Sequence, residues 1–385
     1  MTKKHSIPLL IFCGLSAYII QSHLSGINPA LHSLHAAFPA YPAEMIFLVS
    51  TLASLFSIPS CLASGALTRR WGVRRTLFVG ISVFLTASIL PVVLTRFSAI
   101  LVTRAVAGLA AGLILPLGPA LVSAYFQDLQ TRGKLLGWGS TAGNLAGMFL
   151  SVGAGHLAAV SVRFFWLVHL IMLVPLMAAV LMPEPELLSE PAEQPLPQGA
   201  KLSRHSWVFI LLFPLAILFY WPFVLNLSHL VAELGGTSVE TGYAFTLSSV
   251  GGMLYGLVYG ALYKRLGRRL LSVACGSVLV LFVVCALAQQ LWLLYLGVFA
   301  GSLTLFAVFI DFGITATATP TARVRAVGIN MAAANVAIFA GGLLHPWLGS
   351  LLGQGDNVRF LFYPGILFFA GGTIWFFVRP PKVGE

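Results

Sequence analysis

Long apolar runs separated by short polar segments fill this chain of 385 residues. The runs lie at residues 7–30, 43–67, 76–95, 97–124, 135–159, 164–182, 207–230, 241–263, 270–288, 291–315, 325–351 and 359–378. Each run is long enough to cross a hydrocarbon core of about 30 Å as an α-helix. The pattern therefore predicts an all-α membrane protein with twelve transmembrane helices, numbered here as spans one to twelve.

A basic turn occurs twice and divides the spans into two sets. The first copy is Gly65-Ala-Leu-Thr-Arg69-Arg70-Trp-Gly72-Val-Arg74-Arg75, and the second is Gly260-Ala-Leu-Tyr-Lys264-Arg265-Leu-Gly267-Arg268-Arg269, which starts 195 residues later. The copies follow span two and span eight. A duplication of this kind in a membrane chain predicts a two-lobed transporter with a binding site between its halves.

The segment between spans six and seven has a different composition. It is rich in proline and acidic residues from Pro183 to Pro197, and basic residues follow at Lys201 and Arg204. Such a segment cannot bury enough apolar surface to fold alone. We therefore expect a six-helix lobe over residues 1–182, a cytoplasmic linker over 183–206 and a second lobe over 207–385.

Composition and charge placement support the membrane assignment. Hydrophobic residues make up 58 % of the chain and charged residues 9 %, which excludes an ordinary water-soluble protein. The net charge of +11 does not indicate nucleic-acid binding, because the basic residues lie in short loops beside apolar runs. Of the 22 basic residues, eighteen fall in one set of loops and three in the other. This bias predicts a multi-pass protein of the cell inner membrane or plasma membrane with both termini in the cytoplasm.

The chain resembles the major facilitator superfamily over nearly its whole length. The resemblance rests on the twelve spans, the central linker, the two basic turns and an arginine-and-glycine pattern in span four, Arg104-Ala-Val-Ala-Gly108-Leu-Ala-Ala-Gly112, which is similar to that of superfamily exporters. It implies two pseudo-symmetric six-helix lobes, with spans one, four, seven and ten lining the cavity.

The family carries an aspartate at the fifth position of the turn, where this chain has Arg69 and Lys264. That acid helps to close the cytoplasmic side, so its role does not transfer to Arg69. The antiporter glycine-proline signature is absent from span five.

Two charged side chains lie well inside spans, where ionised groups are costly and are functional by default. Arg104 in span four either contacts an anionic substrate, modulates a proton-binding acid or fixes helix packing through backbone carbonyls. Asp311 in span ten either carries a proton, because burial favours its neutral form, or pairs with Arg323 or Arg325.

Glu44 begins span two at the outer edge, shortly after His32 and His35. The three residues predict either a pH-sensitive outer gate or a solvated loop with a helix cap, and their spacing matches no strong metal motif. We assign proton coupling to Asp311 and, secondarily, to Glu44.

Neutral polar and aromatic residues within spans form a second group of candidates. Each either hydrogen-bonds the substrate or joins two helices. The expected substrate-binding set is Arg104, Tyr18, Gln21, His23, Asn144, Tyr220, Trp221, Asn226, Tyr255, Asn330 and Asn335. The expected conformational-gating set is Gly65, Arg69, Arg70, Gly72, Arg74, Arg75, Gly260, Arg265, Gly267 and Arg268.

These features favour a secondary transporter of a small organic molecule that works by alternating access, with proton-coupled efflux as the first hypothesis. Uptake of a small organic anion is the alternative. The chain has no nucleotide-binding loop and no nucleophile–base or His-Glu-x-x-His pattern, which argues against ATP drive and against a membrane enzyme. We expect a monomer in the lipid bilayer whose partners are a small-molecule substrate and protons, with no nucleic acid, cofactor or metal.

Overall fold

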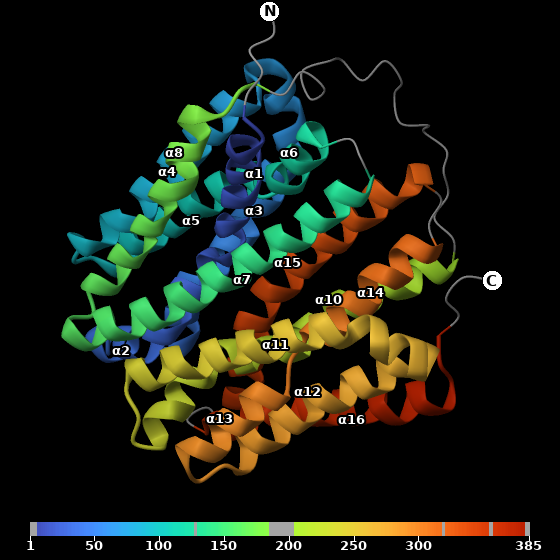
Figure 1. Ribbon diagram of the computed structural model, residues 1–385. Coiled ribbons are helices and arrows are strands. Elements are labelled where there is room, and N and C mark those ends of the chain that lie inside the picture. The colour runs from blue at the N-terminus through green and yellow to red at the C-terminus, as the bar shows by residue number, and fades with distance from the viewer. Residues whose placement is uncertain (1–5, 127–128, 185–203, 318–319, 354–356, 382–385) are drawn as a thin grey trace, which may run out of the picture. The chain divides into compact units, whose positions relative to one another are not determined.

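The computed structural model describes residues 6–126, 129–184, 204–317, 320–353 and 357–381, and every regular element in these ranges is helical (Figure 1). Two compact units emerge from the backbone contacts. Unit 1 consists of Met1–Ala40 and Leu48–Glu193, and unit 2 of Tyr41–Phe47 and Gln194–Glu385. Most of the predicted linker, residues 185–203, lies outside the described residues.

The helices of unit 1 fall into six membrane crossings. They are α1 (Ile7–Ser16), η1 (Ala17–Gly26), η2 (Asn28–Ala30), α2 (Leu31–Ala37), α3 (Ala43–Trp71, which starts in the Tyr41–Phe47 segment), α4 (Val73–Ile89), η3 (Leu90–Val92), α5 (Phe97–Ile114), α6 (Leu117–Tyr125), α7 (Leu129–Val160), η4 (Phe164–Met172) and α8 (Leu173–Leu181). The η elements are 3₁₀-helices. A buried core of alanine, leucine, isoleucine and phenylalanine side chains joins α1, α4, α5, α6 and α8.

The helices of unit 2 repeat this order. They are α10 (Arg204–Glu233), α11 (Ser238–Leu266), η5 (Gly267–Arg269), α12 (Leu270–Leu287), α13 (Leu291–Ala300), α14 (Thr304–Thr317), α15 (Pro320–Leu351), η6 (Val358–Phe362) and α16 (Tyr363–Val378). Figure 1 shows α12 and α16 side by side in this unit, as α4 and α8 are in unit 1.

Within the described residues, ten segments are long and apolar enough to cross a membrane, and one of them, Ser238–Leu287, contains both α11 and α12. The shorter apolar segment Ile7–Ile20 supplies the first crossing. The total agrees with the twelve predicted spans. The all-helical membrane fold is therefore confirmed.

Two predicted spans are interrupted helices. Span four breaks between α5 and α6, where Pro116 has no N–H to donate to the preceding turn. Span ten breaks between α13 and α14 at residues 301–303. There the Tyr255 hydroxyl donates to the Ala300 carbonyl, and the Ser302 hydroxyl accepts from the Thr304 N–H at 3.2 Å. Side chains thus satisfy backbone groups that the break releases, as the membrane interior requires.

Glycines permit backbone contact between helices in both units. A Cβ atom on Gly108 of α5 would lie 2.3 Å from the carbonyl oxygen of Ala53 on α3, and one on Gly112 would lie 2.1 Å from that of Ser57. In unit 2, a Cβ on Gly251 of α11 would lie 2.1 Å from the carbonyl oxygen of Phe299 on α13. The corresponding spans, two with four and eight with ten, are therefore held together in the same way in both units.

Candidate functional site

Arg104 lies inside unit 1 between α4 and η4. Its side chain is 1 % exposed, its Nη2 donates to the Ala87 carbonyl at 2.8 Å, and its Cζ lies 4.8 Å from the centre of the Trp166 ring. Its Nε has no hydrogen-bond partner among the described residues. A backbone carbonyl and a cation–π contact offset part of the cost of a buried guanidinium. These contacts are of the helix-packing kind, and a substrate contact by Arg104 stays a prediction.

Tyr18 of η1 packs tightly against α7. The ring is 4 % exposed and clusters with Val122 and Leu135, and a Cβ on Gly139 would lie 2.5 Å from the Tyr18 Cε2 atom. The Ser22 hydroxyl donates to the Gly143 carbonyl on the same face of α7. The side chains of Gln21 and His23, which share η1, lie outside the described part of the structure. Asn144, the candidate on α7, is exposed.

A buried polar link in unit 2 joins α10 to α15. Pro222 lies inside α10 and has no N–H, so the Leu218 carbonyl four residues earlier lacks its helical donor. His345 of α15 fills this place: its Nε2 lies 2.9 Å from the Leu218 oxygen, which fixes the proton on Nε2. His345 is 2 % exposed. His345 therefore completes the backbone hydrogen bonding of another helix.

Three of the predicted substrate contacts lie on α10 around this link. Trp221 is 9 % exposed, and its indole N–H has no hydrogen-bond partner among the described residues. Asn226 is buried and its amide donates to the Pro222 carbonyl at 2.9 Å. Tyr220 packs against the rings of Phe223 and Phe282 at centroid distances of 5.4 and 6.2 Å. Of the three, Trp221 keeps a buried donor unused.

The remaining candidates of unit 2 divide in the same way. The Asn335 amide donates to the Met331 carbonyl on its own helix at 3.1 Å, and Tyr255 is engaged at the break of span ten. Asn330 on α15 is 3 % exposed, and its Oδ1 has no partner among the described residues. Asn330 therefore resembles Trp221: it is buried, neutral and only partly satisfied.

The two candidate proton carriers are described to different extents. Asp311 belongs to α14, but its side chain lies outside the described part of the structure. Glu44 stands in the first turn of α3, half-buried, where an acid interacts favourably with the helix dipole. Burial lowers the pKa of His32, and the charge of His35 lowers it further. Proton coupling through Asp311 or Glu44 stays a prediction.

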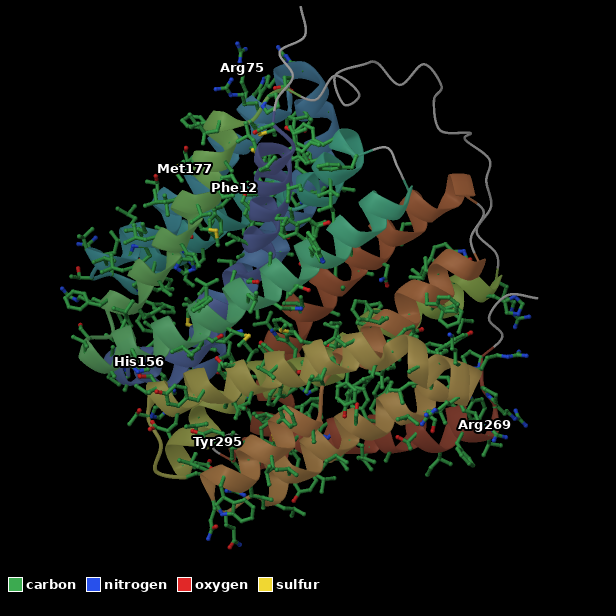
Figure 2. The ribbon with its side chains drawn as sticks, viewed as in Figure 1. Phe12, Arg75, His156, Met177, Arg269 and Tyr295 are labelled. Atoms are coloured by element: carbon green, nitrogen blue, oxygen red, sulfur yellow. The ribbon has the colours of Figure 1, made fainter. Side chains whose placement is uncertain are left out.

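Gly72 of the first basic turn has a backbone conformation that favours glycine over other residues. Gly72 has φ 85°, a conformation that L side chains rarely adopt, and α4 begins at the next residue. Arg74 donates from its Nη2 to the Val180 carbonyl at 2.5 Å. Gly65, Arg70 and Arg75 are exposed. Figure 2 shows Arg75 at one end of unit 1. The Arg69 side chain lies outside the described part.

An acid that the sequence analysis did not single out lies at the N-terminal end of α4. Glu184, two residues beyond the buried Met182, accepts hydrogen bonds from the backbone N–H groups of Val73 and Arg74, the latter at 3.1 Å. The neighbouring Pro183 carbonyl accepts from the Tyr125 hydroxyl at 2.8 Å. Burial raises the pKa of the Tyr125 phenol, and Cys13 and Glu184 raise it further. The first residues of the predicted linker are therefore anchored to unit 1.

For the second basic turn, no such cap is found among the described residues. Gly267 has φ 53°, and a short 3₁₀ turn, η5, separates it from α12, whose first turn has no side-chain cap. Gly260, Arg265 and the neighbouring Lys264 are exposed, and Arg268 is half-buried. Arg269 places its guanidinium 5.3 Å from the Phe377 ring centre and lies at an end of unit 2 in Figure 2.

Comparison with known proteins assigns the family. A family model described as Major Facilitator Superfamily matches residues 10–227 and 208–385. The chain belongs to the major facilitator superfamily. This superfamily member is thus a multi-pass membrane protein.

Relatives of this superfamily member differ in what they carry. It is 28 % identical over 146 residues to the multidrug transporter mfsC of Aspergillus fumigatus, a match that spans 37 % of this chain and 28 % of that relative. Its fold is similar to that of a D-xylose-proton symporter, with a TM-score of 0.73 and 17 % identity over 97 % of this chain and 98 % of that chain. A nucleoside transporter gives a TM-score of 0.70 and 13 % identity over 95 % and 96 %. At this identity the two structures show the fold alone.

Proposed function

We propose that this transporter exports a small, amphipathic and largely uncharged organic molecule by alternating access, driven by protons. Four buried neutral groups of unit 2 carry the proposal. They have no hydrogen-bond partner among the described residues: the Trp221 indole N–H, the Ser228 hydroxyl, the Tyr259 hydroxyl and the Asn330 amide oxygen. Buried polar groups are normally paired, so unpaired neutral donors and acceptors favour a ligand that offers a few neutral polar atoms.

The charged groups support a neutral substrate rather than an anion. The Arg104 guanidinium is the cation at membrane depth, and it is engaged by the Ala87 carbonyl and the Trp166 ring within unit 1. An anion would have to displace or share these contacts. The similarity to a multidrug transporter, although it covers 37 % of the chain, favours efflux.

A ligand screen on the purified protein tests the substrate class. Neutral and cationic amphipathic compounds should raise the unfolding temperature, because a ligand stabilises the state that it binds, whereas small organic anions should not. Trp221→Phe and Asn330→Ala should each weaken the affinity of the best compound about five- to tenfold, the effect of one lost hydrogen bond. Trp347→Phe, which alters a tryptophan that is 57 % exposed on α15, is the matched control and should bind normally.

Uptake of an anion remains the alternative, and Arg104 discriminates between the two. If Arg104 fixes helix packing, Arg104→Ala should lower the unfolding temperature and leave the affinity of the remaining folded protein unchanged. If Arg104 binds an anionic substrate, Arg104→Ala should abolish transport while the protein stays folded. In that case Arg104→Lys should rescue poorly, because lysine lacks the planar fork of donors. The second outcome would contradict export of a neutral molecule.

Proton coupling is assigned to Asp311. Asp311→Asn imitates the protonated carboxyl, so it should abolish transport driven by a pH gradient and preserve substrate binding and exchange without a gradient. Glu44→Gln should have a smaller effect, because Glu44 lies in the first turn of α3 at the water interface. Proteoliposomes with an imposed pH gradient provide the measurement. Gradient-driven transport at the normal rate by Asp311→Asn would make Asp311 structural.

Both termini are assigned to the cytoplasm from the placement of the basic residues. Reporter fusions after Gln198 and after Gln354 should then report opposite sides of the membrane. Two fusions on one side would overturn the topology.

A further inference from the structure

A groove of about 760 Å³ opens on the surface of unit 1, where α3 ends, α4 begins and α8 ends. Two arginines line it, Arg74 and Arg75, and apolar side chains form the rest of its wall, among them Trp71, Phe78, Val79 and Val180. All of these residues belong to one unit. The groove is therefore a feature of that unit's own surface.

The two ends of the groove differ in chemistry. Arg74 and Arg75 are exposed, and no ion pair between described residues involves either of them. Arg74 donates one hydrogen bond, to the Val180 carbonyl. The nearest described acid, Glu184, directs its carboxylate to the backbone N–H groups of Val73 and Arg74. Two guanidinium groups against one carboxylate leave this end of the groove positive.

The apolar end lies on the outward faces of transmembrane segments. Phe78, Val79 and Val180 are 43, 42 and 46 % exposed, and they lie within the candidate spans Val73–Val92 and Phe164–Leu181. One span begins and the other ends at the arginines. Exposed apolar side chains on a membrane span face acyl chains, so the arginines lie at the depth of the lipid headgroups.

A ligand that fits must be an anion at one end and a hydrocarbon at the other. We propose that the groove binds an anionic phospholipid from the leaflet that faces the basic turns. The phosphate lies on Arg74 and Arg75, since guanidinium groups bind phosphate oxygens in pairs. One acyl chain lies along Phe78, Val79 and Val180. A soluble phosphate would use the arginines alone and gain nothing from the apolar wall.

Lipid titration of the purified full-length protein in a nonionic detergent tests the proposal. The probes are dioleoyl phosphatidylglycerol, dioleoyl phosphatidylcholine, glycerol 3-phosphate and inorganic phosphate, with binding followed by native mass spectrometry and by the unfolding temperature. Phosphatidylglycerol should bind most tightly. The variant R74Q/R75Q should weaken phosphatidylglycerol binding about 30-fold, since each basic residue near an anionic lipid contributes about fivefold.

Two further variants keep the test decisive. Arg75→Gln alone removes no described hydrogen bond, should fold normally and should weaken binding about fivefold. K264Q/R265Q removes two exposed charges from the corresponding turn of unit 2 and should change binding less than twofold. An equal loss in K264Q/R265Q, an unchanged affinity in Arg75→Gln, equal binding of phosphatidylcholine, or displacement of phosphatidylglycerol by an equal concentration of inorganic phosphate would each overturn the proposal.

Discussion

The two basic turns start from similar sequences and end in different structures. In unit 1 the turn closes on Gly72, α4 starts at once, and the carboxylate of Glu184 accepts from its first two backbone N–H groups. In unit 2 the turn closes on Gly267, the 3₁₀ turn η5 intervenes, and α12 starts without a side-chain cap. Among the described residues, one helix of the pair has a counter-charge at its positive end, and none is found at the other.

The difference arises far away along the chain. The residues that follow α8 are Met182, Pro183 and Glu184, whereas Arg379 and Pro380 follow α16. In unit 2, helix α16 ends beside the second turn: Arg269 contacts the Phe377 ring, and the Ser272 hydroxyl donates to the Thr373 carbonyl. The same arrangement thus delivers an acid in unit 1 and a base in unit 2. Symmetry of the sequence repeat does not ensure symmetry of its electrostatics.

The largest expected contrast comes from replacing the two glycines. Gly72→Ala forces a side chain into φ 85° and puts its Cβ 2.9 Å from the Glu184 Oε1, so it loses both the backbone fit and the cap. Gly267→Ala suffers the backbone strain alone, because nothing lies within 4 Å of its Cβ. We expect Gly72→Ala to cost about 1–2 kcal/mol more. Unfolding temperatures in one detergent measure this, and equal losses would contradict the cap.

Removing the charge of Glu184 should have the next largest effect. Glu184→Gln leaves one neutral acceptor in place of a carboxylate that accepts twice, a loss of about 1 kcal/mol. Glu184→Asp keeps the charge on a shorter side chain and should fall between. The double variant Gly72→Ala/Glu184→Gln should lose less than the sum of the two single variants, since both act on one interaction. If the two losses of stability are fully additive, Glu184 and Gly72 act independently and the proposed shared interaction is wrong.

The pH dependence of stability tests the contact between Tyr125 and the residues that follow α8. Tyr125→Phe removes the hydrogen bond to the Pro183 carbonyl and should cost about 1 kcal/mol near pH 7. The raised pKa means that the native state favours the neutral phenol, so its contribution is complete below the ordinary tyrosine pKa of 10.0 and is lost as pH rises through the higher native pKa. Stability measured from pH 8 to 11.5 should therefore fall less steeply for Tyr125→Phe than for the parent.

Unit 2 offers the converse experiment. Arg379→Glu places an acid directly after α16, whereas Glu184 is the third residue after α8. If the carboxylate reaches the start of α12, stability should rise by about 0.5 kcal/mol, and high salt should reduce the gain. Arg379→Gln is the control for the loss of the contact between Arg379 and the Trp375 ring. A gain of the same size in the control would assign it to that contact instead.

The smallest expected change concerns gating. Arg69 stands where the superfamily carries an acid, and a cation at that place cannot meet the positive end of a helix favourably. We expect a weaker lock on the side of the basic turns, and Arg69→Asp should protect engineered cysteines there from labelling. Lys264→Asp makes the same change in the second turn and serves as the comparison. An unchanged labelling pattern in Arg69→Asp would contradict this assignment.

The apolar pattern was sufficient to predict the membrane spans, because a crossing needs about twenty apolar residues and little else. Gly72 and Gly267 were also visible, since both copies of the turn keep a glycine at the position that needs a positive φ. Glu184 could not be predicted. It lies 110 residues from Arg74 in the sequence, and the composition of the segment around it suggested an unfolded linker. The sequence offered backbone carbonyls as one of three kinds of partner for Arg104 but could not choose among them, and the structure shows the Ala87 carbonyl.

The glycine contacts also restrict how the protein can move. The backbone of Gly108 and Gly112 lies directly against that of Ala53 and Ser57, and the backbone of Gly251 lies against that of Phe299. Surfaces in such contact cannot slide by a fraction of a helical turn without collision. We therefore expect two helix pairs to move together, α3 with α5 and α11 with α13. The displacement that a transport cycle requires has to come from segments outside these pairs, so each helix pair moves as one rigid body.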